Sequence, residues 1–270
     1  GHILHVNLTD GEITTEKPAE SFYRTYMGGS ALAMHYILNE MPAGVDPLGP
    51  NNMFVVSVGV LTGAPISGLS RVMINAKSPL TGAIGDSQGG GFWPAELKRA
   101  GFDAIVIRGQ SPRPVYLWIH DGEAEIRDAS HLWGKITGEA EQALQEELGD
   151  KRIQVLQIGP AGEKLVRFAS VMNMSSRANG RTGMGAVMGS KHLKAIVVRG
   201  HGRPGVHDSE ALTRLARWGA KNVDIVGAMA EHGTANTVIG QQESGDLPTR
   251  NWSSGVFDHY EAISGPTMTK

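Results

Sequence analysis

The sequence predicts an α+β fold built from two similar halves. The runs Ala104-Ile-Val-Ile-Arg-Gly109 and Ala195-Ile-Val-Val-Arg-Gly200 differ at one position, and each has the length and composition of a buried strand. Residues 3–15 and 115–127 both alternate apolar and polar side chains about an Asp-Gly pair, a strong short-range signal for a β-hairpin. We therefore infer a pseudo-symmetric internal duplication, with halves at about 1–109 and 113–200.

The segments between the hairpin and the last strand also correspond. Residues 54–59 and 153–159 are apolar runs of strand length that stop at glycine, and residues 71–76 and 166–171 supply one more strand in each half. A glycine-rich stretch follows in both halves. Each half is thus predicted to run hairpin, helix, strand, strand, glycine loop, short helix, strand.

In the first half, residues 18–39 are mainly helical, with Gly28-Gly29 as a break or a point of tight packing. Prolines and glycines mark loops at 41–50 and 61–70. Residues 92–99 read as a short helix that tolerates proline in its first turn.

In the second half, apolar residues at helical spacing predict a helix that ends at Gly149. These residues are Ile136, Ala140, Leu144 and Leu148. Residues 159–162 are expected to form a turn, and residues 164–173 a strand that leads into the second glycine stretch.

Beyond Gly200 the character of the sequence changes. Residues 201–205 indicate a boundary, and Ser209 is a candidate N-cap for a helix that ends near Lys221. From about Gly233 the sequence is rich in loop residues.

The two glycine stretches are candidate anion cradles. In residues 175–191, Gly180, Gly183, Gly185 and Gly189 allow sharp turns and close approach of backbone N–H groups to a ligand, and Arg177 and Arg181 offer planar forks for phosphate oxygens. Residues 82–91 repeat the design, and Arg71 precedes them. The competing interpretation is that packing alone requires the glycines and that the arginines form surface ion pairs. The recurrence of arginine beside both stretches favours a ligand.

Composition excludes several classes of protein. Of 270 residues, 40% are apolar and 19% charged, and 25 basic against 27 acidic residues give a net charge of −2. No basic run suggests a nucleic-acid partner. No apolar run approaches the roughly 20 residues that cross a bilayer, so we expect a cytoplasmic protein with no membrane partner.

Metal and nucleotide motifs are weak. Cysteine is absent, so this chain alone holds no disulfide and no thiolate-bound cluster. The ten histidines show no His-Glu-x-x-His spacing. A dinucleotide fingerprint starting at Gly183 fails because Met188 stands at its third glycine, and the Gly-Ser-Lys order that ends at Lys191 inverts a phosphate loop.

Seven motifs in order nevertheless resemble the N-terminal part of tungsten-dependent aldehyde:ferredoxin oxidoreductases. They are Val6-Asn-Leu-Thr, Gly59-Val-Leu-Thr-Gly63, Lys77-Ser-Pro-Leu-Thr-Gly82, Ala95-Glu-Leu-Lys98, Arg127-Asp-Ala-Ser-His-Leu-Trp-Gly134, Ile158-Gly-Pro-Ala-Gly-Glu163 and Gly185-Ala-Val-Met-Gly-Ser-Lys191. The resemblance covers residues 1–203 almost without gaps. It implies a cofactor-binding domain of two related mixed β-sheets over residues 1–203, and the beginning of an incomplete, mainly helical second domain over residues 204–270.

The resemblance also implies a bis-pyranopterin cofactor that carries tungsten or molybdenum. The positions that match the family's pterin contacts are Arg71, Gln88, Gly90, Arg177, Ala178 and Gly180. Backbone oxygens at Gln88 and Ala178 match those that hold a Mg²⁺ ion between the two pterin phosphates. The family usually has asparagine where this chain has Gln88, a change that a backbone ligand tolerates; Asp86 and Asn179 are also untypical.

The activity implied is oxidation of an aldehyde to a carboxylic acid, with electrons leaving through a [4Fe-4S] cluster to ferredoxin or an electron-transfer subunit. The cysteines for that cluster, and the residues of the substrate pocket, are absent from this chain. The rest of the enzyme, or a partner chain, is expected to supply them, and a homo-oligomer is expected. Three alternatives stay open: a subunit of a benzoyl-CoA reductase-type complex, a non-catalytic pterin-binding module, and a ligand-free structural domain.

Overall fold

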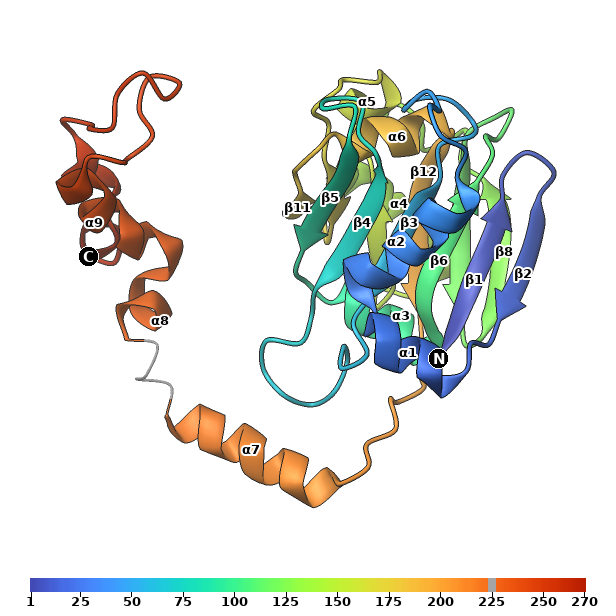
Figure 1. Ribbon diagram of the computed structural model, residues 1–270, viewed down its shortest axis with the longest axis horizontal. Helices are drawn as coiled ribbons and strands as arrows, with labels where there is room; N and C mark the ends of the chain where they lie inside the picture. Colours follow the sequence, from blue (N-terminus) through green and yellow to red (C-terminus); the bar gives the residue numbers. More distant parts are fainter. Residues whose placement is uncertain (223–226) are drawn as a thin grey trace. The chain divides into compact units, whose positions relative to one another are not determined.

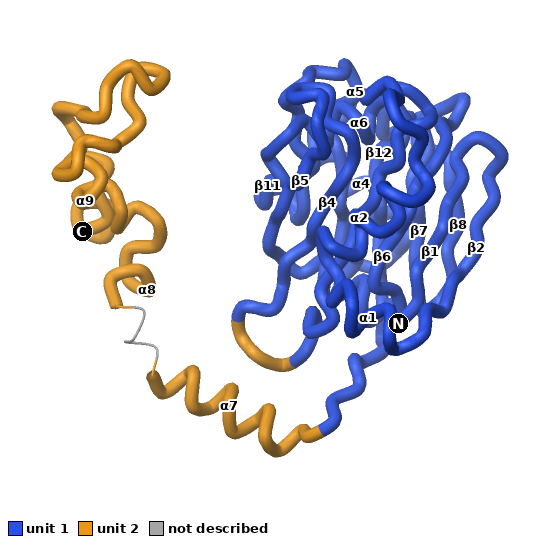
Figure 2. The backbone as a smooth tube through the Cα atoms, in the orientation of Figure 1, with its two compact units in different colours: residues 1–64, 68–207 blue, residues 65–67, 208–270 orange. Residues whose placement is uncertain are grey.

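The computed structural model describes residues 1–222 and 227–270 (Figure 1). The chain divides into two compact units, shown in Figure 2. Unit 1 contains residues 1–64 and 68–207, and unit 2 contains residues 65–67 and 208–270. All sheet structure described below belongs to unit 1.

Unit 1 contains two mixed sheets of six strands. Sheet 1 has the spatial order β2-β1-β6-β3-β4-β5, and its only parallel pair among the described strands is β1 with β6. Its strands are β1 (His2–Asn7), β2 (Glu12–Glu16), β3 (Phe54–Val58), β4 (Val72–Lys77), β5 (Ile84–Gly89) and β6 (Phe102–Arg108).

Sheet 2 repeats this plan strand for strand. Its order is β8-β7-β12-β9-β10-β11, with β7 and β12 parallel. Its strands are β7 (Val115–His120), β8 (Glu123–Asp128), β9 (Gln154–Gln157), β10 (Val171–Asn173), β11 (Arg177–Asn179) and β12 (Leu193–Arg199). The predicted duplication into two pseudo-symmetric mixed sheets is confirmed.

The strand registers extend the match to single residues. One row of paired residues crosses each sheet from the first strand of the hairpin to the edge strand at the other end. This row holds Leu4, Ile105, Val56, Ile74 and Ser87 in sheet 1, and Leu117, Ile196, Leu156, Asn173 and Arg177 in sheet 2. We call two residues equivalent when they occupy the same place in these registers.

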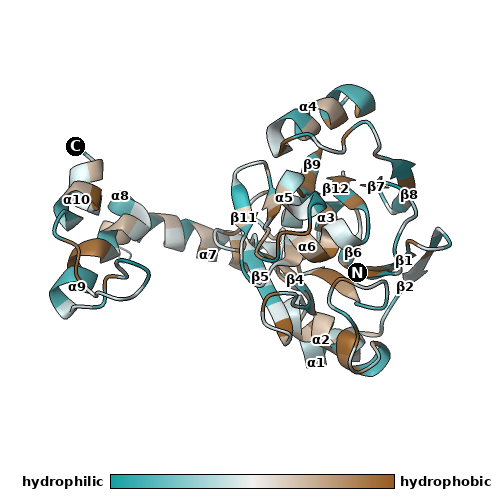
Figure 3. Ribbon diagram, turned by 90° about the horizontal axis from the view of Figure 1, so that it is seen from above, coloured by the Kyte–Doolittle hydropathy of each residue, from teal (hydrophilic) through white to brown (hydrophobic). Residues whose placement is uncertain are grey.

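Helices cover the outer faces of both sheets and fill the space between them, as Figure 3 shows from above. The helices are α1 (Glu20–Tyr26) and α2 (Gly29–Glu40) outside sheet 1, α4 (Thr137–Leu148) outside sheet 2, and α3 (Trp93–Arg99) and α6 (Met184–Ser190) between the sheets. The central core is apolar except for placed polar contacts, such as the Trp93 Nε1 that donates to the Ile196 carbonyl over 2.9 Å. Burial of this apolar surface is the main stabilising term.

Local chemistry explains several element ends. Asp121 and Gly122 both have positive φ (42° and 90°), which forms the two-residue hairpin loop predicted between β7 and β8. Gly149 takes the left-handed conformation that closes α4, as expected. Gly28, with φ of 80°, separates α1 from α2, so the predicted break is also confirmed.

Other predictions about unit 1 were wrong. The first glycine stretch is not a loop, because β5 runs through it as far as Gly89 and pairs with β4. Residues 164–170 are turn and coil, and only Val171–Asn173 forms the expected strand. The predicted turn at 159–162 is the one-turn helix α5 (Pro160–Glu163), which packs on α6.

Unit 2 is mainly helical in its described part. It contains α7 (Ser209–Lys221), α8 (Ala228–His232), η2 (Gly233–Asn236), α9 (Thr237–Ser244), η3 (Tyr260–Ile263) and α10 (Gly265–Met268). Asp208, not Ser209, is the N-cap of α7: its carboxylate accepts from the Ala211 N–H over 2.8 Å. The stretch after Gly233, expected to be loop-rich, contains several short helices, but residues 245–259 are turn and coil as expected. No helix in the described ranges is long and apolar enough to cross a membrane.

Candidate functional site

The candidate site lies where the free edges of the two sheets meet. β5 ends sheet 1 and β11 ends sheet 2, and the two edge strands lie side by side (Figure 1). We call this junction the seam and define it as residues 87–92, 173 and 177–181. It contains five of the six positions that the family resemblance assigns to the pterin, and Arg71 directly precedes β4, the strand that pairs with β5.

Equivalent residues meet across the seam. The registers make Gly89 equivalent to Asn179, because they pair with Val72 and Val171, which occupy the same place in their sheets. A Cβ on Gly89 would lie 2.4 Å from Asn179 Oδ1, so the two positions are in direct contact. The pseudo-twofold axis that relates the repeats therefore passes between β5 and β11.

The predicted site residues occupy equivalent places about this axis. Gln88 is equivalent to Ala178, and Gly90 to Gly180. Gln88, Ala178 and Gly180 are exposed and Gly90 is partly exposed. A Cβ on Gly90 would meet no atom within 4 Å, so the backbone there is open to a ligand. The seam thus presents two matching stretches of accessible backbone.

The arginines near the seam are free to bind an anion. Arg71, Arg177 and Arg181 are exposed, and none forms an ion pair with any residue of the described ranges. Their recurrence, however, is not a product of the duplication: Arg177 is equivalent to Ser87, and Arg71 to Ser170. The two repeats contribute positive charge from different positions.

Three of the four glycines in the second stretch serve packing, so the prediction of a ligand-facing role for them was wrong. Gly183, Gly185 and Gly189 are buried at or within α6. A Cβ on Gly189 would lie 2.0 Å from the Gly162 carbonyl oxygen, and a Cβ on Gly185 would lie 2.5 Å from the Ser170 carbonyl oxygen. Of these four, only Gly180 faces solvent. The glycines of α6 let it approach α5 and the chain before β10.

The sequence predicted no role for two buried asparagines of the seam. Asn173 and Asn179 are buried, and their side-chain amides donate to carbonyl oxygens of the first repeat. Phe92, which is exposed beside Gly91, was also missed as a seam residue. The available signal is a difference between the repeats. Asn173 stands where the first repeat has the apolar Ile74, and Asn179 stands where it has Gly89. This difference is visible only once the strands are in register.

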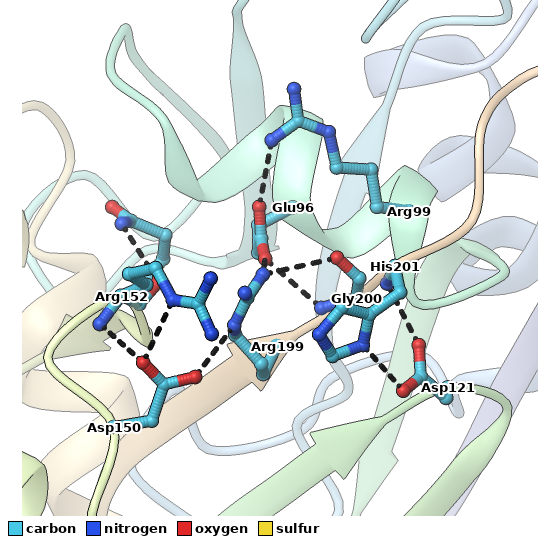
Figure 4. A network of polar contacts seen from close by, with 9 residues as sticks. Glu96, Arg99, Asp121, Asp150, Arg152, Arg199, Gly200 and His201 are labelled. Carbon is cyan, nitrogen blue, oxygen red and sulfur yellow. Dashed lines mark hydrogen bonds and ion pairs between the residues drawn. The ribbon is translucent and has the colours of Figure 1, made fainter.

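A second polar cluster joins the repeats and has a structural role (Figure 4). The buried Glu96 carboxylate accepts from Arg199 Nη1 at 2.6 Å, from the Gly200 N–H at 3.0 Å and from Arg99 at 3.0 Å. Arg199 also binds Asp150, and hydrogen bonds from the Arg152 N–H and Arg199 lower the pKa of Asp150 to about 2. Each charge in this cluster is paired, so the cluster offers no free group for a ligand.

Other features give weaker site candidates. A cavity of about 650 Å³ is lined by Asn7, Glu40, Pro50, Arg108 and neighbouring residues, but it lies away from the seam and its arginine is paired with Glu40. Within residues 1–222 and 227–270, no three His, Asp or Glu side chains gather as metal ligands. The seam therefore remains the best candidate, and any cation there would rely on backbone oxygens.

The seam fits a flat, anionic ligand with two similar halves. It offers accessible backbone at equivalent positions, a glycine in each repeat where a side chain would block approach, and unpaired guanidinium groups. These are donor groups for phosphate and for hydrogen-bonding ring edges. Side chains able to bind a transition metal directly are not gathered there in the described structure.

Comparisons with known proteins agree with this geometry. Residues 3–200 match the family model of the aldehyde ferredoxin oxidoreductase N-terminal domain, and residues 210–270 match that of domains 2 and 3 of the same family. A tungsten-containing aldehyde ferredoxin oxidoreductase of Pyrococcus abyssi is 48% identical over 99% of this chain and 45% of its own length.

More distant relatives have other names. The WOR-like subunit of an aliphatic sulfonate oxidoreductase from Pyrococcus furiosus is 34% identical over 97% of this chain and 44% of its own length. A chain of the active-site complex BamBC of benzoyl coenzyme A reductase, solved with 1,5-dienoyl-CoA, superimposes with a TM-score of 0.75 and 35% identity over 92% of this chain and 36% of that chain. The chain spans less than half the length of these relatives. On these matches, the chain belongs to the aldehyde ferredoxin oxidoreductase family.

Proposed function

We propose that the seam is the base for a bis-pyranopterin cofactor carrying tungsten or molybdenum, in an enzyme that oxidises aldehydes to carboxylic acids. The observation that carries this proposal is the contact between the equivalent residues Gly89 and Asn179, which puts a pseudo-twofold axis through the seam. A cofactor made of two like pterin halves matches two like strands about one axis. The tungsten-containing relatives support the choice of cofactor.

The residues of this chain would bind and orient the group. Arg71 and Arg177 would neutralise phosphate or pterin charge, and the open backbone at Gly90 and Gly180 would let the rings approach closely. When bound, the cofactor supplies the two-electron redox chemistry, while the protein supplies position and electrostatics.

A Mg²⁺ ion between the phosphates would take backbone oxygens of Gln88 and Ala178. These residues are equivalent, so each repeat would contribute a ligand from the same strand position. Magnesium prefers hard oxygen ligands and keeps several waters, which suits a site with few protein ligands. The exchange of the family's asparagine for Gln88 leaves the backbone oxygen unchanged.

Electron transfer needs parts outside this sequence. Because the chain has no cysteine, the ligands of a [4Fe-4S] cluster would come from the remaining length seen in the relatives or from a partner chain. Ferredoxin, or an electron-transfer subunit, would accept the electrons in the cytoplasm. We also propose a homo-oligomer, with residues 204–270 as the beginning of a second domain.

Elemental and pterin analysis tests the proposal. The protein, purified without oxygen from its natural host, is expected to contain tungsten or molybdenum, magnesium, phosphorus and about two pterins for each metal, in line with the cofactor's chemistry. Arg177→Ala should reduce the pterin content with the fold intact, whereas Arg113→Ala, an exposed arginine outside the seam, should not. Absence of both metals and of pterin would refute the proposal.

A second candidate is the active-site subunit of a benzoyl-CoA reductase-type complex. The superposition on the BamBC chain is the observation in its favour. The same purified protein separates the two activities: turnover of aldehydes favours the first, and reduction of aromatic acyl thioesters with a low-potential electron donor favours the second. Bound pterin without either activity would indicate a binding module.

A further inference from the structure

We propose that Asn173 and Asn179 are positioning residues of the cofactor base: their buried amides hold β5 and β11 at a fixed offset without touching the cofactor. This role rests on the proposed function of the seam and adds residues that the family resemblance does not assign. It follows from how the two edge strands are joined, from the room made for the amides, and from the side of the seam on which they lie.

The edge strands β5 and β11 belong to different sheets, so hydrogen bonds that involve side chains join them instead of a strand ladder. Asn179 Nδ2 donates to the Ser87 carbonyl at 3.2 Å and lies 3.5 Å from the Val72 carbonyl. Asn173 Nδ2 donates to the Gly90 carbonyl at 2.7 Å. A further bond links the Arg181 N–H to Ser87 Oγ at 3.2 Å. Both amides therefore belong to the second repeat and donate hydrogen bonds to backbone carbonyl oxygens of the first.

The first repeat leaves room for each amide. A Cβ on Gly89 would lie 2.4 Å from Asn179 Oδ1, and a Cβ on Gly91 would lie 2.5 Å from Asn173 Nδ2. Gly91 also has a φ of 124°, which other residues rarely adopt. Since the acceptors are carbonyl oxygens, each amide must present its nitrogen to them, so the assignment of nitrogen and oxygen is fixed by the contacts.

Stability alone does not account for this pair. Asn173 and Asn179 are fully buried, and neither Oδ1 receives a hydrogen bond in the described structure. A buried acceptor without a donor is costly, and apolar residues are the usual solution at such positions. The equivalent position to Asn173 in the first repeat is the apolar Ile74. The amides thus provide geometry at a cost in stability.

The amides lie beneath the predicted cofactor contacts. Asn179 is the buried neighbour of the exposed Ala178 and Gly180, and Asn173 binds the carbonyl of Gly90 itself. A ligand that contacts both repeats depends on the offset between them. A seam held in the binding geometry before the ligand arrives avoids the entropy cost of ordering it on binding.

The test compares Asn179→Asp and Asn173→Asp with Gln157→Glu in the cofactor-loaded protein. Each aspartate removes the amide donor at nearly constant volume. Gln157 is a matched control, because it is fully buried in β9, donates to the Thr137 carbonyl at 2.9 Å and also has an unpartnered Oε1, but lies outside the seam. Asn179→Ser, shorter and neutral, replaces the aspartate variant if that variant does not fold.

Two readouts separate positioning from general stability. Pterin and metal per chain after gel filtration should fall at least about tenfold in the seam variants, and hydrogen exchange at the Arg181 amide, which donates to Ser87 Oγ across the seam, should accelerate. Gln157→Glu should lower the melting temperature by a similar amount and keep its pterin. If the seam variants retain as much pterin as Gln157→Glu, the positioning role is overturned and the proposed function is unaffected. A wild-type protein without pterin would overturn the proposed function and this role together.

Discussion

Equivalent bulges in the two sheets carry opposite buried charges. Asp103 in β6 and Lys194 in β12 are each the unpaired residue at a register shift against the neighbouring parallel strand. Asp103 binds Lys98 of α3 at 2.5 Å, and Lys194 binds Glu163 of α5 at 2.5 Å. The apolar residues of the strands are similar in the two sheets and maintain the shared topology. The sign of the buried charge can differ between the sheets, because each charge needs only an opposite partner on the helix nearest to it.

The seam shows the same division. Its strands keep equivalent backbone positions, but the arginines and the buried amides differ between the repeats. Duplication therefore supplied the pseudo-twofold frame, and later divergence supplied the polar groups that use it. Substitutions at equivalent positions can break this comparison or sharpen it.

The largest effect is expected from Lys194→Met. Lys194 is fully buried and also donates to the Lys135 carbonyl at 2.9 Å. Its loss leaves the buried Glu163 carboxylate uncompensated, which should lower the free energy of unfolding by about 3–5 kcal/mol. Urea unfolding measures the change. Lys194→Met combined with Glu163→Gln should recover most of it, and a double variant as unstable as the single one would contradict the pairing.

Lys191 should make stability depend on pH. It is fully buried, donates to the Gly109 carbonyl at 2.9 Å and has Ala100 as its equivalent in the first repeat. Burial lowers its pKa from 10.5 to about 8. Between these values the unfolded chain binds a proton that the folded chain does not, so the free energy of unfolding should rise with pH by about 3 kcal/mol.

Lys191→Met isolates this contribution. The stability of wild type minus that of the variant, followed by urea unfolding between pH 7 and 10, should increase with pH. The variant itself should be the more stable protein near pH 7, because it buries no charge. A difference that does not vary with pH would show that the pKa of Lys191 is the same in the folded and the unfolded protein.

Gly189→Ala should damage the second repeat specifically. Its new Cβ would lie 2.0 Å from the Gly162 carbonyl oxygen, a backbone atom that cannot rotate away. Overpacking of this kind costs about 1–3 kcal/mol. The control is Gly138→Ala in α4, where a Cβ meets nothing within 4 Å and helix propensity should add about 1 kcal/mol. Equal melting temperatures for the two variants would refute the close packing of α5 on α6.

The smallest effects concern the equivalent arginines Arg108 and Arg199. Arg199 is largely buried and binds both Glu96 and Asp150, whereas Arg108 is more exposed and binds Glu40 and His5. Arg199→Met should cost about 1–2 kcal/mol and Arg108→Met less than about 1 kcal/mol, because solvent screens the second pair. Added salt should widen the difference between the two costs slightly, because it screens the exposed Arg108 pair more than the buried Arg199 pairs. Reversal of the order of the two costs would show that burial does not govern these pairs.

The sequence by itself determined the duplicated topology. Strand length, apolar runs, Asp-Gly turns and near-identical strands are local properties of the chain, so the halves, the hairpins, the break at Gly28-Gly29 and the end of α4 at Gly149 could be predicted from it. The family resemblance also selected positions that the structure places about one axis, Gln88 with Ala178 and Gly90 with Gly180.

Only the tertiary structure decided which glycines face a ligand and which face a neighbour. A glycine looks the same in the sequence whatever fills the space of its missing Cβ. At Gly90 that space is open to a ligand, whereas at Gly189 it is occupied by a carbonyl oxygen of another segment. The first glycine stretch likewise became strand β5 because β4 offers it a hydrogen-bonding partner. The roles of Asn173 and Asn179 depend on atoms more than eighty residues away in the sequence, and no local pattern encodes such contacts.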